Sequence, residues 1–197
     1  MEVITGPGGL SRCAWGVSAP EYAHYHDAEW GYPVGDDRAL FEKLCLESFQ
    51  SGLAWITVLR KRAAFRRAFH DFEPARVAAM GPDDVEHLLG DAGIIRHRGK
   101  IESAINNARQ TLRLQGSQSL ASFVWAYEPA EPAPLASRSP ESEALSRALK
   151  ERGFSWLGPT TVYAFMQAMG LVNDHLPECH FRRECAEARA TFSAPAT

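Results

Sequence analysis

The sequence contains no run of about 18 apolar residues, so we expect no membrane-spanning helix. Its first ten residues, MEVITGPGGL, lack a basic segment followed by an apolar one, so we expect no signal peptide, no membrane partner and a cytoplasmic protein. An excess of positive charge is also missing, because 21 Lys and Arg face 24 Asp and Glu, which gives a net charge of −3. Any nucleic-acid site must therefore be a local patch.

Cysteine is scarce, with four residues in 197, at positions 13, 45, 179 and 185. Disulfides are rare in the cytosol, so we expect free thiols. Cys45 lies in an apolar helical segment and is expected to be buried as a small hydrophobic residue. The other three cysteines lie near the two ends of the chain.

The alternation of apolar and polar residues that marks a half-buried strand is almost absent. Apolar residues recur with helical spacing instead, and hydrophobic residues make up 45% of the chain, enough for a packed core. The length fits one domain or one domain split into two lobes. We therefore predict an all-α single domain with a proline-rich loop at 128–140. The predicted helices cover 36–51, 55–69 with a break near Lys61, 82–90, 101–112, 119–127, 140–153 and 159–169.

Two segments are locally basic. Residues 60–67, RKRAAFRR, carry five positive charges and no acid, and residues 96–100, RHRGK, carry three more. Each segment could bind phosphates or could simply be the solvated face of a helix.

Four residues near the two ends form a possible metal site. Cys13 and His26 lie thirteen positions apart, and His175 and Cys179 lie four apart. A Cys2His2 set suits tetrahedral zinc, because thiolate and imidazole ligands favour zinc over calcium or magnesium. The 148 residues between the pairs are unlike a local zinc finger, so by spacing alone the pairs could be unrelated. Two neighbours could also compete as ligands, His180 and Cys185.

Glu47 is a carboxylate in an unusual place. On a helix with 100° per residue it falls about 20° from Leu40 and about 60° from Leu44, both on the apolar face. A carboxylate at this border is costly unless it is paired or hydrogen-bonded. Glu47 is therefore a candidate catalytic or ligand-recognising group, although an edge residue that reaches water or caps a neighbouring helix fits the same pattern.

Aromatic residues crowd the neighbouring sequence. Trp15, Tyr22, Tyr25 and Trp30 lie within sixteen residues, and Trp55 follows Glu47 by eight. Aromatic residues usually belong to the core, but two prolines and a glycine predict that much of this segment is an irregular loop. Rings on such a loop could form a stacking pocket, the standard device for holding an unpaired base.

The segment 153–158, GFSWLG, joins two predicted helices and has a glycine at each end. Glycine lets the backbone approach a partner closely, and the amides that begin the next helix favour a phosphate. The pattern is similar to a helix-hairpin-helix DNA-binding element, although a plain corner between helices is the simpler interpretation.

Together these segments resemble the 3-methyladenine DNA glycosylase I family, also called the Tag type. The matching segments are RCAW at 12–15, YHDAEWG at 25–31, LFEKLCLESFQSGLAWITVLRKR at 40–62, DAGIIRHRGKIESAINNAR at 91–109 and LSRALKERGFSWLGPTTVYAFMQAMGLVNDH at 145–175, followed by Cys179. The resemblance covers about residues 12–180.

The resemblance implies an all-α fold of the helix-hairpin-helix glycosylase type, with a glycosylase domain at 12–185 and flexible tails at 1–11 and 186–197. It implies one structural zinc per chain, which joins the two chain ends and leaves no open position for catalysis. The implied zinc ligands are Cys13, His26, His175 and Cys179. His180 and Cys185 drop out because they lie where the resemblance fades.

The resemblance also implies a base pocket, because family members excise 3-methyladenine from alkylated DNA. Methylation at N3 makes the adenine cationic, so it departs more readily than neutral adenine, and aromatic rings favour a cationic ring. Glu47 would hydrogen-bond the adenine edge while water attacks the sugar carbon, and whether Glu47 also activates that water stays open. The implied catalytic residues are Glu47 and Tyr25, and the implied base-binding residues are Trp15, Tyr22, Trp30 and Trp55.

Contacts with duplex DNA are expected outside this pocket. The resemblance suggests that Gln50 and Leu53 fill the gap left by the flipped nucleotide, although ordinary packing would also explain them. The other expected DNA contacts are Arg98, Lys150, Gly153 and Gly158.

Superfamily enzymes with lyase activity carry a lysine just after the hairpin, where this chain has GPTT at 158–161. We therefore expect a monofunctional enzyme that leaves an abasic site. The superfamily also uses an aspartate near the end of the next helix. Asp174 is the local candidate, but it adjoins His175, and Tag-type enzymes dispense with that aspartate.

The expected partners are alkylated double-stranded DNA, a substrate associated with the bacterial nucleoid, and free 3-methyladenine as product. The chain is expected to be a monomer. Two other functions fit parts of the sequence: a non-enzymatic helix-hairpin-helix DNA-binding module with structural zinc, and a zinc-stabilised protein-interaction domain. Base release would exclude the first, and salt-dependent DNA affinity would argue against the second.

Overall fold

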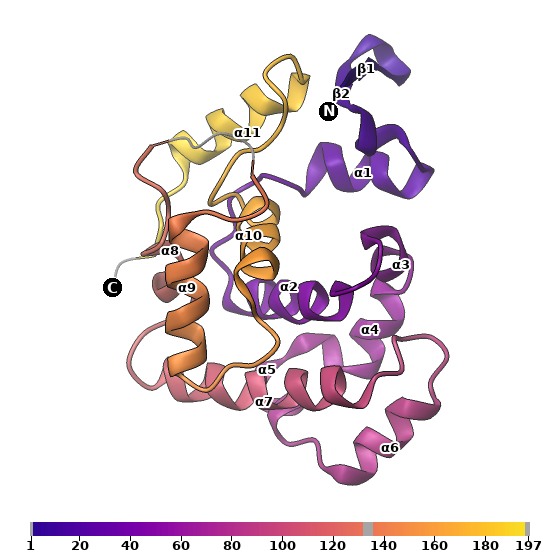
Figure 1. Cartoon of the computed structure of the whole chain (residues 1–197), viewed down its shortest axis with the longest axis vertical. Helices are drawn as coiled ribbons and strands as arrows, with labels where there is room; N and C mark the ends of the chain where they lie inside the picture. Colours follow the sequence, from indigo (N-terminus) through magenta and orange to yellow (C-terminus); the bar gives the residue numbers. More distant parts are fainter. Residues whose placement is uncertain (1, 132–135, 196–197) are drawn as a thin grey trace.

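Helix α2 (Asp37–Gln50) runs through the middle of the computed structural model, which describes residues 2–131 and 136–195 (Figure 1). The helix begins where the Asp36 carboxylate accepts a hydrogen bond from the Ala39 amide at 2.8 Å, a standard N-cap. Every residue from Lys43 to Phe49 is buried, so α2 is covered on all sides. The helices that pack against α2 are α3 (Trp55–Leu59), α7 (Arg98–Gln115), α8 (Leu120–Trp125) and α10 (Pro159–Ala168).

The other elements of the described residues are two strands, three 3-10 turns and six helices. They are strands β1 (Val3–Thr5) and β2 (Ser11–Cys13), 3-10 turns η1 (Pro7–Gly9), η2 (Ala14–Val17) and η3 (His70–Phe72), and helices α1 (Pro20–Ala28), α4 (Arg62–Ala68), α5 (Pro74–Ala78), α6 (Pro82–Gly90), α9 (Pro140–Glu151) and α11 (His180–Thr191). The predicted break near Lys61 is confirmed, since it separates α3 from α4. Part of the predicted loop, residues 132–135, lies outside the described residues. Over the described part of the chain, none of the helices combines the length and apolar character that crossing a membrane requires.

The chain ends contain structure that sequence analysis missed. β1 and β2 pair antiparallel, with Val3 opposite Cys13, so the all-α prediction is wrong for this short hairpin. Helix α1 replaces a predicted loop, and α11 extends to Thr191, so the predicted tails 1–11 and 186–197 are both too long. Each helix buries only two residues, Tyr25 and His26 in α1 and Phe181 and Cys185 in α11, so neither carries the long apolar stripe that reveals a helix in a sequence.

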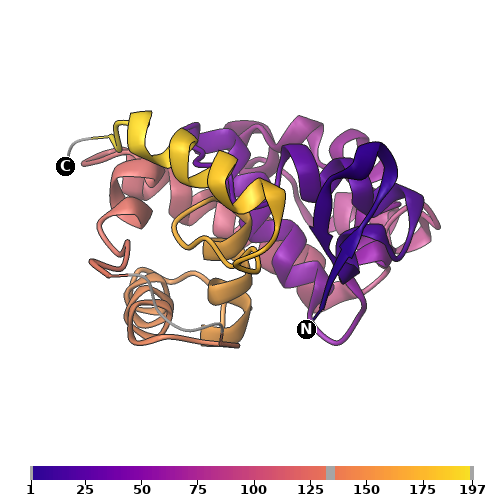
Figure 2. The same ribbon diagram turned by 90° about the horizontal axis from the view of Figure 1, so that it is seen from above.

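The N-terminal elements and the start of α11 lie at the same end of the molecule (Figure 1). β1, β2 and α1 gather there beside the first turns of α11, whereas α6 lies at the opposite end of the long axis (Figures 1 and 2). Contacts between α11 and β2 connect the ends directly. Residues separated by about 150 positions in the sequence can therefore share one site.

Helices α9 and α10 pack against each other and are joined by the turn 152–158. Ser139 begins α9 and exchanges side-chain and backbone hydrogen bonds with Ser142. Gly153 follows α9 with φ at +84°, a left-handed conformation that glycine adopts without strain. Pro159 is the first residue of α10, so the helix starts immediately after Gly158.

Candidate functional site

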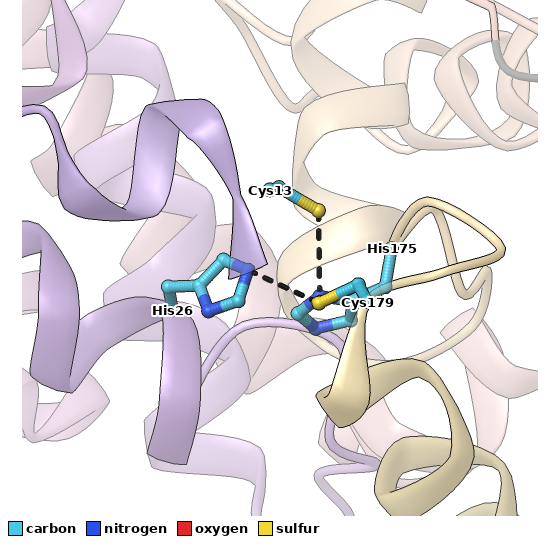
Figure 3. A group of neighbouring side chains, drawn as sticks. All are labelled: Cys13, His26, His175 and Cys179. Atoms are coloured by element: carbon cyan, nitrogen blue, oxygen red, sulfur yellow. Dashed lines mark hydrogen bonds between the residues drawn. The ribbon is translucent and has the colours of Figure 1, made fainter. Parts of the chain in front are cut away.

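The four predicted metal ligands, Cys13, His26, His175 and Cys179, meet in one buried cluster (Figure 3). Their ligand atoms all lie within 4.8 Å of one another. Cys179 Sγ is 3.5 Å from His175 Nδ1 and 3.7 Å from His26 Nε2, and Cys13 Sγ is 3.9 Å from His175 Nδ1. Ligands around a tetrahedral zinc would lie about 3.4–3.8 Å apart, given Zn–N and Zn–S bonds of about 2.1 and 2.3 Å. The cluster therefore could hold a metal ion.

Hydrogen bonds orient both imidazoles toward the centre of the cluster. His26 Nδ1 lies 2.8 Å from Asp27 Oδ1, and His175 Nε2 lies 3.0 Å from the Trp30 carbonyl oxygen. Donation through these bonds leaves the opposite ring nitrogen of each histidine free to bind a metal. Arg12 supports the arrangement by pairing with Asp27 at 2.8 Å.

Burial shapes the protonation of the cluster. It lowers the pKa of His175 to about 4 and also lowers the pKa of His26, so both rings are neutral near pH 7. Neutral imidazole is the form that binds metals. Burial likewise raises the pKa of the Cys13 thiol to about 11, so thiolate formation there needs a nearby cation to offset the cost.

The two competing ligands lie outside the cluster. His180 Nε2 is 2.8 Å from Glu184 Oε1. Cys185 is buried, and its Sγ lies 3.7 Å from the Trp30 carbonyl oxygen. The fold thus selects among ligand sets that spacing left open.

Glycine at position 16 allows the N-terminal turn to approach His26. A Cβ added to Gly16 would lie only 2.5 Å from the His26 ring. Any larger residue would push η2 away from α1, and with it Cys13, which directly precedes η2.

A cavity of about 300 Å³ adjoins the cluster and brings the predicted base-pocket residues together. Trp15 packs edge to face against Trp30 and Tyr22, with centroid distances of 5.0 and 5.5 Å, while Tyr25 and Trp55 are tilted at 5.3 Å. The size and the aromatic walls suit a small flat ligand. The tyrosines lie on α1, so the loop prediction was wrong here. The predicted residues in the wall are Trp15, Tyr22, Tyr25, Trp30, Glu47, Gln50 and Trp55.

Glu47 reaches this cavity from α2 and is only 4% exposed. Its Oε1 lies 2.7 Å from the Nζ of Lys43, which is one helical turn earlier and 5% exposed. Lys43 also donates a hydrogen bond to the Tyr25 hydroxyl at 2.8 Å, and its Nζ lies 3.5 Å from the centre of the Trp55 ring. Sequence reasoning missed Lys43, although its spacing of four residues from Glu47 was an available signal.

Asp174 also lines the cavity, although sequence analysis set it aside. Its Oδ2 accepts hydrogen bonds from the Tyr163 hydroxyl at 2.8 Å and from Gln167 Nε2 at 2.7 Å. The cavity wall therefore contains a second carboxylate, held by neutral donors.

The residues predicted to contact DNA lie around the cavity and along the hairpin. Gln50 lines the cavity at the end of α2, and Leu53 follows in the next turn with 41% exposure. Lys150 is exposed on α9. Of the hairpin glycines, Gly153 accepts a hydrogen bond from Asn106 Nδ2 at 2.8 Å, and Gly158 faces open space.

The basic segment 96–100 is less available than its sequence suggests. Arg98 pairs with Glu86 at 2.7 Å and lies 3.8 Å from Glu102. Lys100 is buried and donates to the carbonyl groups of Phe49 at 2.9 Å and Ser51 at 2.6 Å. It therefore closes the C-terminal end of α2.

The other basic segment, 60–67, is largely ion-paired. Three of its arginines contact glutamates on neighbouring elements, so the interpretation as a solvated helix face is favoured. The pairs are Arg60–Glu21, Arg62–Glu29 and Arg66–Glu42.

Trp156 is a surface feature that sequence analysis missed. It is 43% exposed and has φ at +60°, a conformation that a bulky residue rarely adopts. Its ring lies 5.2 Å from that of His97, and its carbonyl accepts a hydrogen bond from Ser48 Oγ at 3.2 Å. An exposed aromatic ring in a strained turn motivates a binding role for the hairpin.

Comparison with known proteins agrees with this geometry. The family model described as methyladenine glycosylase matches residues 15–183. The DNA-3-methyladenine glycosylase 1 of Escherichia coli (strain K12) is 49% identical over 179 residues, which cover 86% of this chain and 96% of that protein. A crystal structure of 3-methyladenine DNA glycosylase I (TAG) matches with a TM-score of 0.82 and 50% identity, over 86% of this chain and 98% of that one. A Tyr-to-Phe variant of a TAG in complex with 3-methyladenine matches with a TM-score of 0.82 and 38% identity, over 87% of this chain and 97% of that one.

The helical fold and the aromatic cavity with its buried carboxylate are thus those of a glycosylase enzyme. The chain belongs to the methyladenine glycosylase family, and the resemblance drawn from the sequence is confirmed.

Proposed function

We propose that this protein is a DNA repair enzyme that releases 3-methyladenine from alkylated double-stranded DNA and leaves an abasic site. The observation that carries the proposal is the 300 Å³ cavity in which aromatic rings surround Glu47. The relative from Escherichia coli is named for this base, and one of the matching structures holds it. A base can enter such a cavity only after it has flipped out of the duplex.

The side chains of the cavity divide between stacking and hydrogen bonding. Two groups of aromatic rings line the cavity. Trp55 and Tyr25 contact each other in one group, and Trp15 contacts Tyr22 and Trp30 in the other. Stacking of a base on an aromatic ring contributes about 1–3 kcal/mol. Glu47 accepts hydrogen bonds from the amino group of adenine. The pocket thereby selects a base that carries hydrogen-bond donors on this edge.

The reaction breaks the bond between the sugar C1′ and N9 of the base. N3-methylation makes the ring electron-poor, so the bonding electrons leave with the base, and water adds to C1′. Glu47 and Tyr25 touch the base, and Asp174 is a second carboxylate close enough to the cavity to stabilise positive charge on the sugar.

The absence of a lysine after the hairpin supports a monofunctional reaction. Residues 158–161 are GPTT, so no amine is available there to form a Schiff base. Lys43 lies close to Glu47 but does not line the cavity, and its Nζ is held by Glu47 and Tyr25.

Zinc is the metal that best suits the cluster of two thiols and two imidazoles. Cys13 and His26 would hold it from the N-terminal end, and His175 and Cys179 from the C-terminal end. Four protein ligands fill a tetrahedral site, so the zinc would be structural and would fasten the chain ends beside the cavity.

DNA would approach the face that carries the hairpin and the turn after α2. The amides at the start of α10 favour a phosphate, and Gly158 leaves the backbone accessible there. Gln50 and Leu53 would fill the space of the flipped nucleotide, while Lys150 and Arg98 would contact phosphates. This arrangement corresponds to a helix-hairpin-helix element, and we expect the enzyme to act as a cytoplasmic monomer.

The decisive experiment measures bases released from methylated duplex DNA by the wild-type chain and by Glu47→Gln. We expect 3-methyladenine from the wild type, a large loss with Glu47→Gln, and intact strands on alkali-free gels. DNA binding without base release would favour the non-enzymatic DNA-binding module instead. Absence of any salt-dependent DNA affinity would favour the protein-interaction domain.

A further inference from the structure

Lys43 places a buried ammonium group directly behind the wall of the base cavity. A second cavity of about 240 Å³ lies on the other side of that wall and is lined by Lys43, whereas the base cavity is not. Tyr25 and Trp55 line both cavities. The Trp55 ring therefore lies between the Lys43 ammonium and the base cavity, with Nζ 3.5 Å from the ring centre.

The charge of Lys43 is directed at the two groups that would attract a cationic ring. It neutralises Glu47 at 2.7 Å and occupies the rear face of Trp55. The neighbouring anion Glu29 is already paired with Arg62, so Glu47 is the carboxylate that balances Lys43. Two cations on opposite faces of one indole ring repel each other, whereas a neutral purine stacks on a ring polarised by a cation without that cost.

We propose that Lys43 is a positioning and specificity residue. It lowers the affinity of the pocket for the cationic methylated base relative to its affinity for the neutral departing base. This inference rests on the proposed function. When the C1′–N9 bond breaks, its electron pair enters the base and neutralises the ring, while water adds to C1′ and loses a proton. A charge that destabilises the cationic base more than the departing base acts in favour of the reaction, because only interactions that improve toward the transition state accelerate it.

Two small probes test this electrostatic role without DNA. Free 3-methyladenine represents the neutral product, and 3,9-dimethyladeninium is cationic at neutral pH and represents the base while it is substituted at N9. The ratio of their dissociation constants is measured for wild type, Lys43→Met, Lys43→Gln and Lys43→Arg. Comparing this ratio between the wild type and the variants cancels the steric effect of the extra methyl group.

Both uncharged variants should shift the ratio toward the cation by about fivefold or more, and Lys43→Arg should keep the wild-type ratio. Lys43→Gln retains a hydrogen-bond donor, so it separates the effect of the charge from the effect of hydrogen bonding. It also serves as a second uncharged variant if Lys43→Met does not fold. Arg67→Met removes an exposed charge on α4 and should leave the ratio unchanged.

Equal losses of affinity for both probes in Lys43→Met and Lys43→Gln would overturn the inference, since a purely structural role predicts them. A shift toward the neutral probe would overturn it as well. If the wild type binds neither probe, the proposed function itself fails, which is a different outcome from an unchanged ratio.

Discussion

Glu47 and Asp174 line the same cavity, but they are stabilised in different ways. Glu47 is balanced by the full charge of Lys43, whereas Asp174 accepts hydrogen bonds from two neutral donors, Tyr163 and Gln167. A buried carboxylate with a cationic partner presents little net charge to a ligand, while one with neutral donors keeps its negative charge. The negative field of the cavity is therefore centred nearer Asp174 than Glu47.

At the same scale, Trp55→Ala should weaken binding of free 3-methyladenine by about 1–3 kcal/mol, because it removes a stacking surface. Isothermal titration with the free base measures this directly. Trp55→Phe keeps a smaller aromatic face and should retain most of the affinity. Unchanged binding in Trp55→Ala would mean that the base does not stack on this ring.

Helix α2 carries Lys43, Glu47 and Gln50, so its position sets the geometry of the cavity. Its C-terminal carbonyl groups would be left without partners at the turn, but Lys100 donates to Phe49 and Ser51. A cation at the end of a helix is also favoured by the helix dipole. A residue on α7 thus fixes the end of the helix that carries the site.

Lys100→Met should therefore lower the free energy of unfolding by about 2–3 kcal/mol, since it removes charged hydrogen bonds to buried carbonyl groups. Urea denaturation of both chains gives this difference. Lys150→Met removes an exposed lysine and should change stability by less than about 0.5 kcal/mol. Similar stability for wild type and Lys100→Met would show that water replaces the ammonium group at no cost.

The hairpin between α9 and α10 makes a separate prediction about DNA. Lys150→Ala should weaken binding of duplex DNA and reduce the slope of log affinity against log salt by about 1, with binding of free 3-methyladenine unchanged. Arg98→Ala should change the slope less, because Arg98 is already paired with Glu86. Fluorescence anisotropy over a salt series measures both slopes, and a larger effect of Arg98→Ala would place the DNA nearer α6 and α7.

At the scale of the whole molecule, the cluster of two cysteines and two histidines brings residues from near the two ends of the chain together. β2 and α1 supply Cys13 and His26, and the segment before α11 supplies His175 and Cys179. Cys13 belongs both to this cluster and to the wall of the aromatic cavity, so we expect a disturbance of the cluster to affect the cavity wall.

Purified protein should accordingly contain one zinc per chain. Cys13→Ser should lower the free energy of unfolding by several kcal/mol, because zinc binding contributes directly to folding. Elemental analysis and thermal melting with and without a chelator measure these effects, and Cys45→Ser, at a buried cysteine outside the cluster, is the matched control. A zinc-free chain that is folded and active would contradict the structural role.

The sequence, together with the family resemblance, was enough to predict the helical fold, most of the helices, the four residues that meet in the Cys/His cluster and the aromatic residues that line the cavity. Helical periodicity is a local property, and the family motifs retain their order along the chain. The sequence did not reveal α1 or α11, because each of these helices buries only two residues and so shows too short an apolar pattern.

Only the tertiary structure decided which partner each charged side chain has. Lys43, Arg98 and Lys100 look alike in the sequence, yet Lys43 forms a buried pair with Glu47, Arg98 is ion-paired at the surface and Lys100 closes the end of a helix. It also determined that Asp174 faces the cavity and that His180 and Cys185 lie outside the metal cluster. These outcomes depend on distances between residues far apart in the chain, which local patterns do not contain because burial and pairing arise only when helices pack.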